Sequence, residues 1–311
     1  MKNMRIVFMG TPDFAKASLQ ALVEKKYNVK GVITVPDKPA GRGQKLRSSS
    51  VKDYAVSQKI PVLQPSNLKD ESFLEELKVL EADIQVVVAF RMLPKAVWNM
   101  PKYGTFNLHA SLLPKYRGAA PINWAVINGD KTSGVTTFFI EDQIDTGNII
   151  FQEMVRIEAY HNAGDLHDKL MRIGSQLVCK TIDAIADGTA PNIKQEGKAT
   201  QAPKIFKDIC QIDWNKDINS IHNHIRGLSP YPTAWTTLFN GKSLKVYKSR
   251  KQAITHDAVI GSVLTDGKSH LKVAVKDGFI FLEEIQLAGK KRMDISDFLR
   301  GFQMNEIIDI K

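Results

Sequence analysis

The sequence of 311 residues is poor in cysteine and contains no long apolar run. Its two cysteines, Cys179 and Cys210, form no Cys-x-x-Cys pair and have no histidine clustered beside them, so a structural zinc site is not expected. No stretch approaches the roughly 18 apolar residues that a membrane span requires. The N-terminal segment also lacks the apolar core and cleavage site of a signal peptide. We therefore expect a cytoplasmic protein with no metal and no membrane partner.

The sequence also lacks internal repeats, heptads, low-complexity tracts and a G-x-G-x-x-G turn. Its first apolar run, residues 4–9, is followed by Gly10-Thr11-Pro12. The missing glycine turn is the feature that lets a pyrophosphate approach the backbone of a dinucleotide-binding domain. A dinucleotide-binding function therefore loses its main support.

Acidic residues are scarce in one region of the sequence, and basic residues outnumber acidic ones overall. The formal net charge is +10, which favours an anionic partner without naming one. Residues 25–52 hold eight basic residues and a single acid, Asp37. The apolar content of 43% is ordinary for a globular protein, and the length allows two domains of about 100–200 residues each.

The N-terminal half has the pattern of an α/β domain. Residues 4–9, 29–35 and 84–90 are short apolar runs that are typical of buried parallel strands. A helix is predicted from Thr11, as N-cap, to about Lys25, with Pro12 at its first position. Because crossovers between parallel strands are right-handed, these elements predict a mostly parallel sheet.

The most informative stretch is residues 106–122, which begins as a strand and ends as a helix. Asn107 and His109 are two residues apart, so their side chains leave the same face of an extended strand. An amide beside an imidazole can stabilise a developing oxyanion and move a proton. Taken alone, however, an Asn-x-His pair is more often a strand cap and a hydrogen-bonded core histidine.

This stretch resembles the signature of the folate-dependent formyltransferases, through Asn107-Leu108-His109-Ala110-Ser111-Leu112-Leu113-Pro114 and Arg117-Gly118-Ala119-Ala120-Pro121-Ile122. In that family an asparagine, a histidine and an aspartate some 35 residues later form the catalytic set. The matching acid is Asp145, in Gln143-Ile144-Asp145-Thr146-Gly147. The resemblance thus implies that Asn107, His109 and Asp145 are catalytic.

The resemblance also implies a folate co-substrate, 10-formyltetrahydrofolate, and two segments that line its pterin pocket. One follows the strand of residues 84–90, at the carboxyl end where open α/β sheets bind ligands. Here the sequence departs from the Tyr-Gly-x-Ile/Leu pattern expected of the family, so the pocket wall is expected to differ. The implied folate-binding residues are Phe90, Arg91, Met92, Leu93, Ser111, Leu112, Leu113 and Pro114.

Residues 36–50 form an unusually long connection, which is rich in glycine, proline and basic residues. Its composition fits either a solvated loop or a finger that binds phosphate. The stretch resembles the insertion by which the methionyl-tRNA formyltransferases of this family contact the acceptor end of tRNA. The implied tRNA contacts are Arg42, Lys38, Lys45 and Arg47.

The C-terminal part follows a different pattern from residue 204. Asn-Gly and Asp-Gly turns separate short strands at 244–247, 271–275 and 279–282, after a helix at 218–228. This indicates an OB-like all-β unit, with 17 basic residues against 12 acidic ones. Such a unit is often a nucleic-acid platform, but it can also be an inert appendage.

The predicted organisation is α/β: a Rossmann-like, mostly parallel formyltransferase domain (1–188), a linker (189–203) and a smaller OB-like tRNA-binding domain (204–311). The resemblance implies a monomeric enzyme that transfers the formyl group of 10-formyltetrahydrofolate to the α-amino group of methionyl initiator tRNA in translation initiation. Two alternatives remain, a formyltransferase acting on a nucleotide-linked amino sugar and a non-catalytic RNA-binding protein.

Overall fold

The computed structural model describes residues 3–40, 45–238 and 241–301. The chain divides into two compact units. Unit 1 comprises Met1–Gly118, Gly134–Val155 and His167–Gln201, and unit 2 comprises Ala119–Ser133, Arg156–Leu166 and Ala202–Lys311. Within the described residues, no helix combines the length and the apolar character that crossing a membrane would require.

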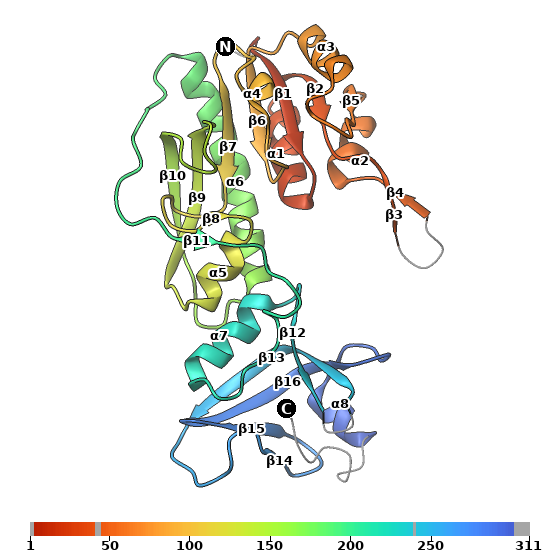
Figure 1. Cartoon of the computed structure of the whole chain (residues 1–311), viewed down its shortest axis with the longest axis vertical. Helices are drawn as coiled ribbons and strands as arrows, with labels where there is room; N and C mark the ends of the chain where they lie inside the picture. Colours follow the sequence, from red (N-terminus) through yellow and green to blue (C-terminus); the bar gives the residue numbers. More distant parts are fainter. Residues whose placement is uncertain (1–2, 41–44, 239–240, 302–311) are drawn as a thin grey trace. The chain divides into compact units, whose positions relative to one another are not determined.

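Unit 1 is organised on a seven-stranded sheet (Figure 1). In sheet order the strands are β10 (Ile149–Arg156), β9 (Thr132–Phe139), β7 (Thr105–His109), β6 (Ile84–Val88), β1 (Arg5–Gly10), β2 (Asn28–Ile33) and β5 (Val62–Leu63). The pairs β1–β2, β1–β6, β2–β5 and β6–β7 are parallel, and β9 lies antiparallel to β7. The prediction of a mostly parallel sheet is therefore confirmed.

The central strands are buried because their side chains are apolar on both faces. Val7, Met9 and Val87 pack with Leu77 and Val97 of the covering helices in one apolar cluster. Unit 1 contains the helices α1 (Asp13–Glu24), α2 (Ser50–Ser57), α3 (Glu71–Val79) and α4 (Lys95–Trp98). It also contains most of α6 (Ala163–Ala186), the longest helix of the described residues.

The start of α1 corrects one detail of the sequence-based prediction. The N-cap is Pro12, whose extended backbone (ψ 178) leaves its carbonyl to accept from Ala15 and Lys16, so Thr11 lies outside the helix. Gly10 is required for packing here, because a Cβ at this position would lie 2.5 Å from the Cβ of Ala15. The glycine therefore brings α1 close to the sheet.

The insertion at residues 36–50, whose composition fitted either a solvated loop or a phosphate-binding finger, contains a short antiparallel hairpin. Strands β3 (Lys38–Ala40) and β4 (Lys45–Arg47) pair with Lys38 opposite Arg47. The base of the hairpin is held by Asp37, which accepts hydrogen bonds from Lys52 Nζ (2.6 Å) and Gln64 Nε2 (2.8 Å). Arg42 lies outside the described residues.

Unit 2 contains an antiparallel sheet, in agreement with the predicted fold. The three predicted C-terminal strands lie within β13, β15 and β16, and the helix expected at 218–228 is α7 (Ile218–Leu228). A short helix, α8 (Ile295–Arg300), was not predicted. In sheet order the strands are β12 (Ala234–Thr237), β13 (Ser243–Ala253), β16 (Gly278–Leu287), β15 (Leu271–Val275) and β14 (Val263–Thr265), with β17 (Met293–Asp294) paired to β16.

The core of unit 2 lies between α7 and this sheet. Ile221 and Ile225 of α7 pack in one cluster with Val246, Val273 and Ile285 of the strands. Helix α5 (Pro121–Ile127) belongs to the same unit, where Asn123 Nδ2 donates to the carbonyl of Gly227 (2.8 Å). Two short strands, β8 (Arg117–Gly118) and β11 (Gln201–Ala202), form a separate two-stranded pair.

Candidate active site

Strand β7 carries two of the predicted site residues on one face. Its register with β9 sets Asn107 opposite Phe138 and His109 opposite Thr136. His109 is only 6% exposed, whereas Asn107 is half-buried. Within the described part of the chain the Asn107 side chain has no hydrogen-bond partner, so its amide is available to a ligand.

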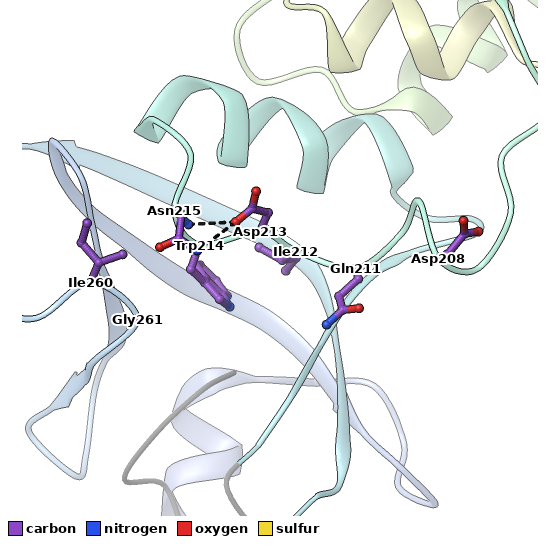
Figure 2. Close-up of a pocket in the computed structure, with 8 residues that line it drawn as sticks. All are labelled: Asp208, Gln211, Ile212, Asp213, Trp214, Asn215, Ile260 and Gly261. Carbon is purple, nitrogen blue, oxygen red and sulfur yellow. Dashed lines mark hydrogen bonds between the residues drawn. The ribbon is translucent and has the colours of Figure 1, made fainter.

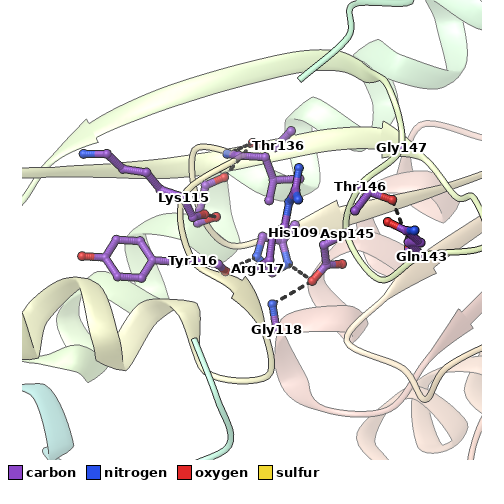
Figure 3. Close-up of polar contacts among 12 residues, drawn as sticks. His109, Lys115, Tyr116, Arg117, Gly118, Thr136, Gln143, Asp145, Thr146 and Gly147 are labelled. Atoms are coloured by element: carbon purple, nitrogen blue, oxygen red, sulfur yellow. Dashed lines mark hydrogen bonds and ion pairs between the residues drawn. The ribbon is translucent and has the colours of Figure 1, made fainter. Parts of the chain in front are cut away.

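The imidazole of His109 is held by groups on both of its nitrogens (Figure 3). Nε2 lies 2.8 Å from the carbonyl oxygen of Tyr116, and Nδ1 lies 3.8 Å from Oδ2 of Asp145. Because a carbonyl can only accept a hydrogen bond, Nε2 carries a proton. Nδ1 is therefore the nitrogen that is left to gain or lose a proton beside a carboxylate.

Asp145 comes from the loop after β9, and the fold brings it to His109 across 36 residues of sequence. Its Oδ2 also accepts the backbone N–H of Gly118 (2.8 Å), and its side chain is 12% exposed. The residue adopts a left-handed backbone conformation (φ 56). The loop then packs tightly on β9, since a Cβ at Gly147 would lie 1.7 Å from the carbonyl oxygen of Phe139. The structure thus brings His109 and Asp145 together, with Asn107 two residues before His109 on the same strand.

Thr136 of β9 binds the first part of the loop between β7 and α5. The Thr136 hydroxyl donates to the carbonyl of Ser111 (2.6 Å) and accepts the N–H of Leu113 (3.1 Å). Gln152 Nε2 donates to Thr136 Oγ1 and to the carbonyl of Leu113. The side chains of Ser111 and Leu113 are buried, so they serve the shape of this loop.

The other predicted folate segment leaves β6 next to this loop. Val88 pairs with Leu108 in parallel, so the chain after β6 and the chain after His109 leave the sheet at the same edge. Leu93 is buried, Phe90 is half-buried, and Met92 is 69% exposed. Both predicted segments therefore lie at the carboxyl ends of neighbouring strands.

Arg91 belongs to the segment that departs from the expected pattern, and its side chain binds the neighbouring chain. Its guanidinium donates to the carbonyls of Ser66 (2.8 Å) and Pro65, and it stacks against the ring of Phe90. Burial lowers the pKa of Arg91. Its Nε–H is buried without a partner in the described structure.

The predicted tRNA contacts are only partly described. Lys38 and Arg47 lie opposite each other on β3 and β4, and Arg47 is exposed. Lys45 begins β4, but its side chain is outside the description, as is the whole of Arg42. The two basic residues that the structure describes, Lys38 and Arg47, therefore form one cross-strand pair of the hairpin.

Unit 2 contains a cavity of about 490 Å³ that the sequence did not predict (Figure 2). Asp213 accepts there from the backbone N–H and the amide of Asn215. The lining has no basic side chain and no histidine, so it offers no positive charge to an anionic ligand. The lining residues are Asp208, Gln211, Ile212, Asp213, Trp214, Asn215, Ile260 and Gly261.

Several groups that shape the site were missed from the sequence. The Tyr116 carbonyl and the Gly118 N–H act through the backbone, so their residue types carry no signal. The hydroxyl of Thr136 has a weak signal at best, as a polar residue in a buried strand. Gln195 lies 50 residues after Asp145, yet it donates to that residue's carbonyl, and nothing in its own sequence neighbourhood points to the site.

Comparison with known proteins covers both parts of the chain. Residues 4–182 match the family described as formyl transferase, and residues 204–303 match formyl transferase, C-terminal domain. A methionyl-tRNA formyltransferase of Parabacteroides distasonis is 58% identical over 313 residues, which cover 97% of each chain. One of Bacteroides fragilis is 53% identical over 319 residues, covering 100% of this chain and 98% of that protein.

Solved structures with the same fold include an N-formyltransferase from Helicobacter canadensis, crystallised in a complex with folinic acid and dTDP-3-aminofucose. It has a TM-score of 0.68 and 24% identity, covering 93% of this chain and 100% of that one. At this identity the likeness concerns the fold alone, whereas the relatives above match at more than half of their positions. The chain therefore belongs to the formyl transferase family, in which its full-length relatives are methionyl-tRNA formyltransferases.

Proposed function

We propose that the protein transfers a formyl group from 10-formyltetrahydrofolate to the α-amino group of methionine on initiator tRNA. The observation that carries the proposal is the arrangement of His109 between the Tyr116 carbonyl and Asp145, with the unpaired amide of Asn107 on the same strand face. The names of the full-length relatives support the choice of acceptor.

The folate would supply the formyl carbon, and the residues of this chain would handle the charges and protons of the transfer. The Asn107 amide would donate to the formyl oxygen as negative charge develops on it. His109 Nδ1 would exchange the proton that the amine loses and the leaving nitrogen gains. Asp145 lies close enough to stabilise positive charge on the ring, and the Nε2 bond to Tyr116 keeps Nδ1 directed toward that carboxylate.

We assign the folate to the shared edge after β6 and β7. The exposed side chain of Met92 and the half-buried ring of Phe90 offer apolar surface. Ser111 and Leu113 would act by shaping the opposite loop, and Leu93 by filling the core behind the segment. The remaining members of the two predicted segments, Leu112 and Pro114, belong to the same loop.

The hairpin of β3 and β4 is proposed to contact tRNA phosphates. Like charges directly opposite each other on paired strands are unfavourable unless an anion lies near. Lys38 and Arg47 form such a pair, and the structure gives neither of them a carboxylate partner among the described residues. A phosphate would relieve this repulsion. We also propose Arg42 and Lys45 as tRNA contacts, on the basis of the sequence alone.

Unit 2 offers a second basic surface, on the face of its sheet. Arg250 of β13, Phe281 of β16 and Lys272 of β15 lie opposite one another in one row. The Arg250 guanidinium lies 4.0 Å from the centroid of Phe281 and also pairs with Glu283 (3.6 Å). Lys272 Nζ lies 5.6 Å from the centroid of Phe281 and 4.0 Å from that of Phe279. An aromatic ring flanked by two cations is suited to nucleic acid. This row supports a role in tRNA binding for residues 204–311.

The decisive experiment compares two acceptors with a labelled formyl donor. Purified protein, 10-formyltetrahydrofolate and charged initiator tRNA should yield formyl-methionyl-tRNA, while dTDP-3-aminofucose should remain unmodified. Transfer to the amino sugar but not to the tRNA would replace the proposed function by the sugar-modifying alternative. Folate binding without formyl transfer to either acceptor would indicate that the protein binds folate but is not a transferase for these acceptors.

A further inference from the structure

We propose that Gln195 is a positioning residue for the formyl-transfer site, because its amide links the loop of Asp145 to the loop of Gly118. The inference deepens the proposed function and rests on it. Gln195 lies in the connection after α6, where it is half-buried while its neighbours from Asn192 to Ala199 are exposed. Its side chain therefore points into the molecule from an otherwise solvated segment.

The amide nitrogen of Gln195 binds the loop that carries Asp145. Nε2 donates to the carbonyl of Asp145 (2.9 Å) and to the carbonyl of Gly147 (2.8 Å), so both of its hydrogens are used on one turn of backbone. Asp145 has a left-handed conformation (φ 56), which is unfavourable for a residue other than glycine. Two bridging hydrogen bonds oppose relaxation of that loop.

The amide oxygen of Gln195 binds the other loop of the site. Oε1 accepts from Nε (3.2 Å) and Nη2 (2.7 Å) of Arg117. Arg117 lies between Tyr116, whose carbonyl holds His109 Nε2, and Gly118, whose N–H holds Asp145 Oδ2. Gln195 thus closes a ring of hydrogen bonds that fixes Asp145 through both its backbone and its carboxylate.

The backbone on one side of Gln195 is anchored to the start of β10, and on the other side to the loop that contains Arg117. Ile193 exchanges two backbone hydrogen bonds with Ile149, at 2.7 and 2.9 Å. Thr200 accepts the N–H of Arg117 through its carbonyl (2.9 Å) and the N–H of Tyr116 through its hydroxyl (2.9 Å). Because both flanks are fixed, the amide needs little additional ordering to hold its four contacts.

The distance that this ring controls is the one between His109 Nδ1 and Asp145 Oδ2, 3.8 Å. A displacement of about 1 Å in a catalytic group can cost as much as 100-fold in rate. We expect Gln195→Ala to lower kcat by about 10- to 100-fold while the KM values for both substrates change by less than about threefold. A residue with only a structural role would instead lower the melting temperature and leave the kcat of the folded fraction unchanged.

Gln195→Glu separates the two halves of the amide. It keeps an acceptor for Arg117 but sets a carboxylate against the carbonyls of Asp145 and Gly147, so it should be at least as impaired as Gln195→Ala. The matched control is Glu196→Ala, an exposed neighbour, which should keep wild-type kcat. Wild-type kcat in Gln195→Glu would overturn the inference, as would a loss in Gln195→Ala that only follows melting temperature.

A readout that does not depend on activity separates this inference from the proposed function. The ¹⁵N chemical shift of His109 Nδ1, measured at one fixed pH, should differ from wild type in both Gln195 variants and stay unchanged in Glu196→Ala. If wild-type protein formylates no charged tRNA, the proposed function fails and this shift alone decides the inference. An unchanged Nδ1 signal in Gln195→Ala would then refute the positioning role.

Discussion

Replacing Asp145 by asparagine tests whether its charge, and not only its shape, serves the transfer. The substitution keeps an oxygen that can accept the Gly118 N–H (2.8 Å) and removes the negative charge 3.8 Å from His109 Nδ1. With Coulomb's law at that separation, an effective dielectric constant of about 20 gives roughly 4 kcal/mol, and that of bulk water gives roughly 1 kcal/mol. The low exposure of both side chains favours a value well above the lower limit.

At about 1.4 kcal/mol per factor of ten, this range corresponds to a loss of roughly 10- to 1000-fold in kcat for Asp145→Asn. The assay is single-turnover formylation of charged initiator tRNA by labelled 10-formyltetrahydrofolate, with both substrates saturating. Because the pair is largely shielded from solvent, the ratio of wild-type to variant rate should change little with ionic strength. The comparison variant is Asp142→Asn, an exposed acid earlier in the same loop.

The charge interaction would be refuted if folded Asp145→Asn kept more than about a third of the wild-type rate. Asp145→Ala adds a second test, because it also leaves the Gly118 N–H without its partner. It should therefore be no faster than Asp145→Asn. An alanine variant that outperforms the asparagine variant would mean that the carboxylate is not what the site requires.

The remaining predictions concern the other parts of the proposed site and one buried histidine. His109→Ala should lose about 10²–10⁴-fold in kcat/KM and Asn107→Ala about 10²–10³-fold, and either assignment is wrong if the folded variant keeps a third of wild-type activity. The double variant Lys38→Glu, Arg47→Glu should lower kcat/KM for charged tRNA at least tenfold and leave folate affinity unchanged; equal losses for both substrates would exclude a tRNA finger. Burial, with smaller effects of Arg226 and Lys251, lowers the pKa of His222 from 6.5 to about 4. The unfolded chain therefore binds a proton that the folded chain does not, and stability present above pH 6.5 is lost as the pH falls toward 4. Urea unfolding at pH 7.5 and 5 should show about 2 kcal/mol more acid destabilisation in wild type than in His222→Gln, and equal losses would contradict this.

The parts of the fold that follow from local periodicity could be predicted from the sequence. Residues 4–9 and 84–90 are apolar on both strand faces, and only a sheet covered on both sides buries such runs. Asn107 and His109 share a face because the period of a strand is two, whatever the rest of the chain does. These predictions required no knowledge of which loops meet in space.

Composition left the structure open where backbone pairing decides it. The glycine, proline and basic residues of 36–50 fit a solvated loop as well as a finger, and they do not reveal that Lys38–Ala40 and Lys45–Arg47 pair as strands, because backbone hydrogen bonds carry no side-chain signal. Thr11 is a good N-cap residue, but the extended Pro12 takes that position instead. In both cases side-chain preference was a weak guide to the path of the backbone.

In the candidate site, the proposed catalytic residues could be predicted from the sequence, whereas the residues that position them could not. Asn107 and His109 stand in one short motif because a single strand presents both. The contacts that shape the site join residues that are far apart in the sequence. Tyr116 is 7 residues and Asp145 36 residues after His109, and Gln195 is 50 residues after Asp145 and 78 after Arg117, while Gly118 and Asp145 are 27 apart. Such contacts exist only once the loops after β7 and β9 and the segment after α6 have met. A related chain that kept the Asn-x-His pair and the aspartate but had replaced Gln195 would therefore still match the motif, and the geometry indicates that its transfer rate would be impaired.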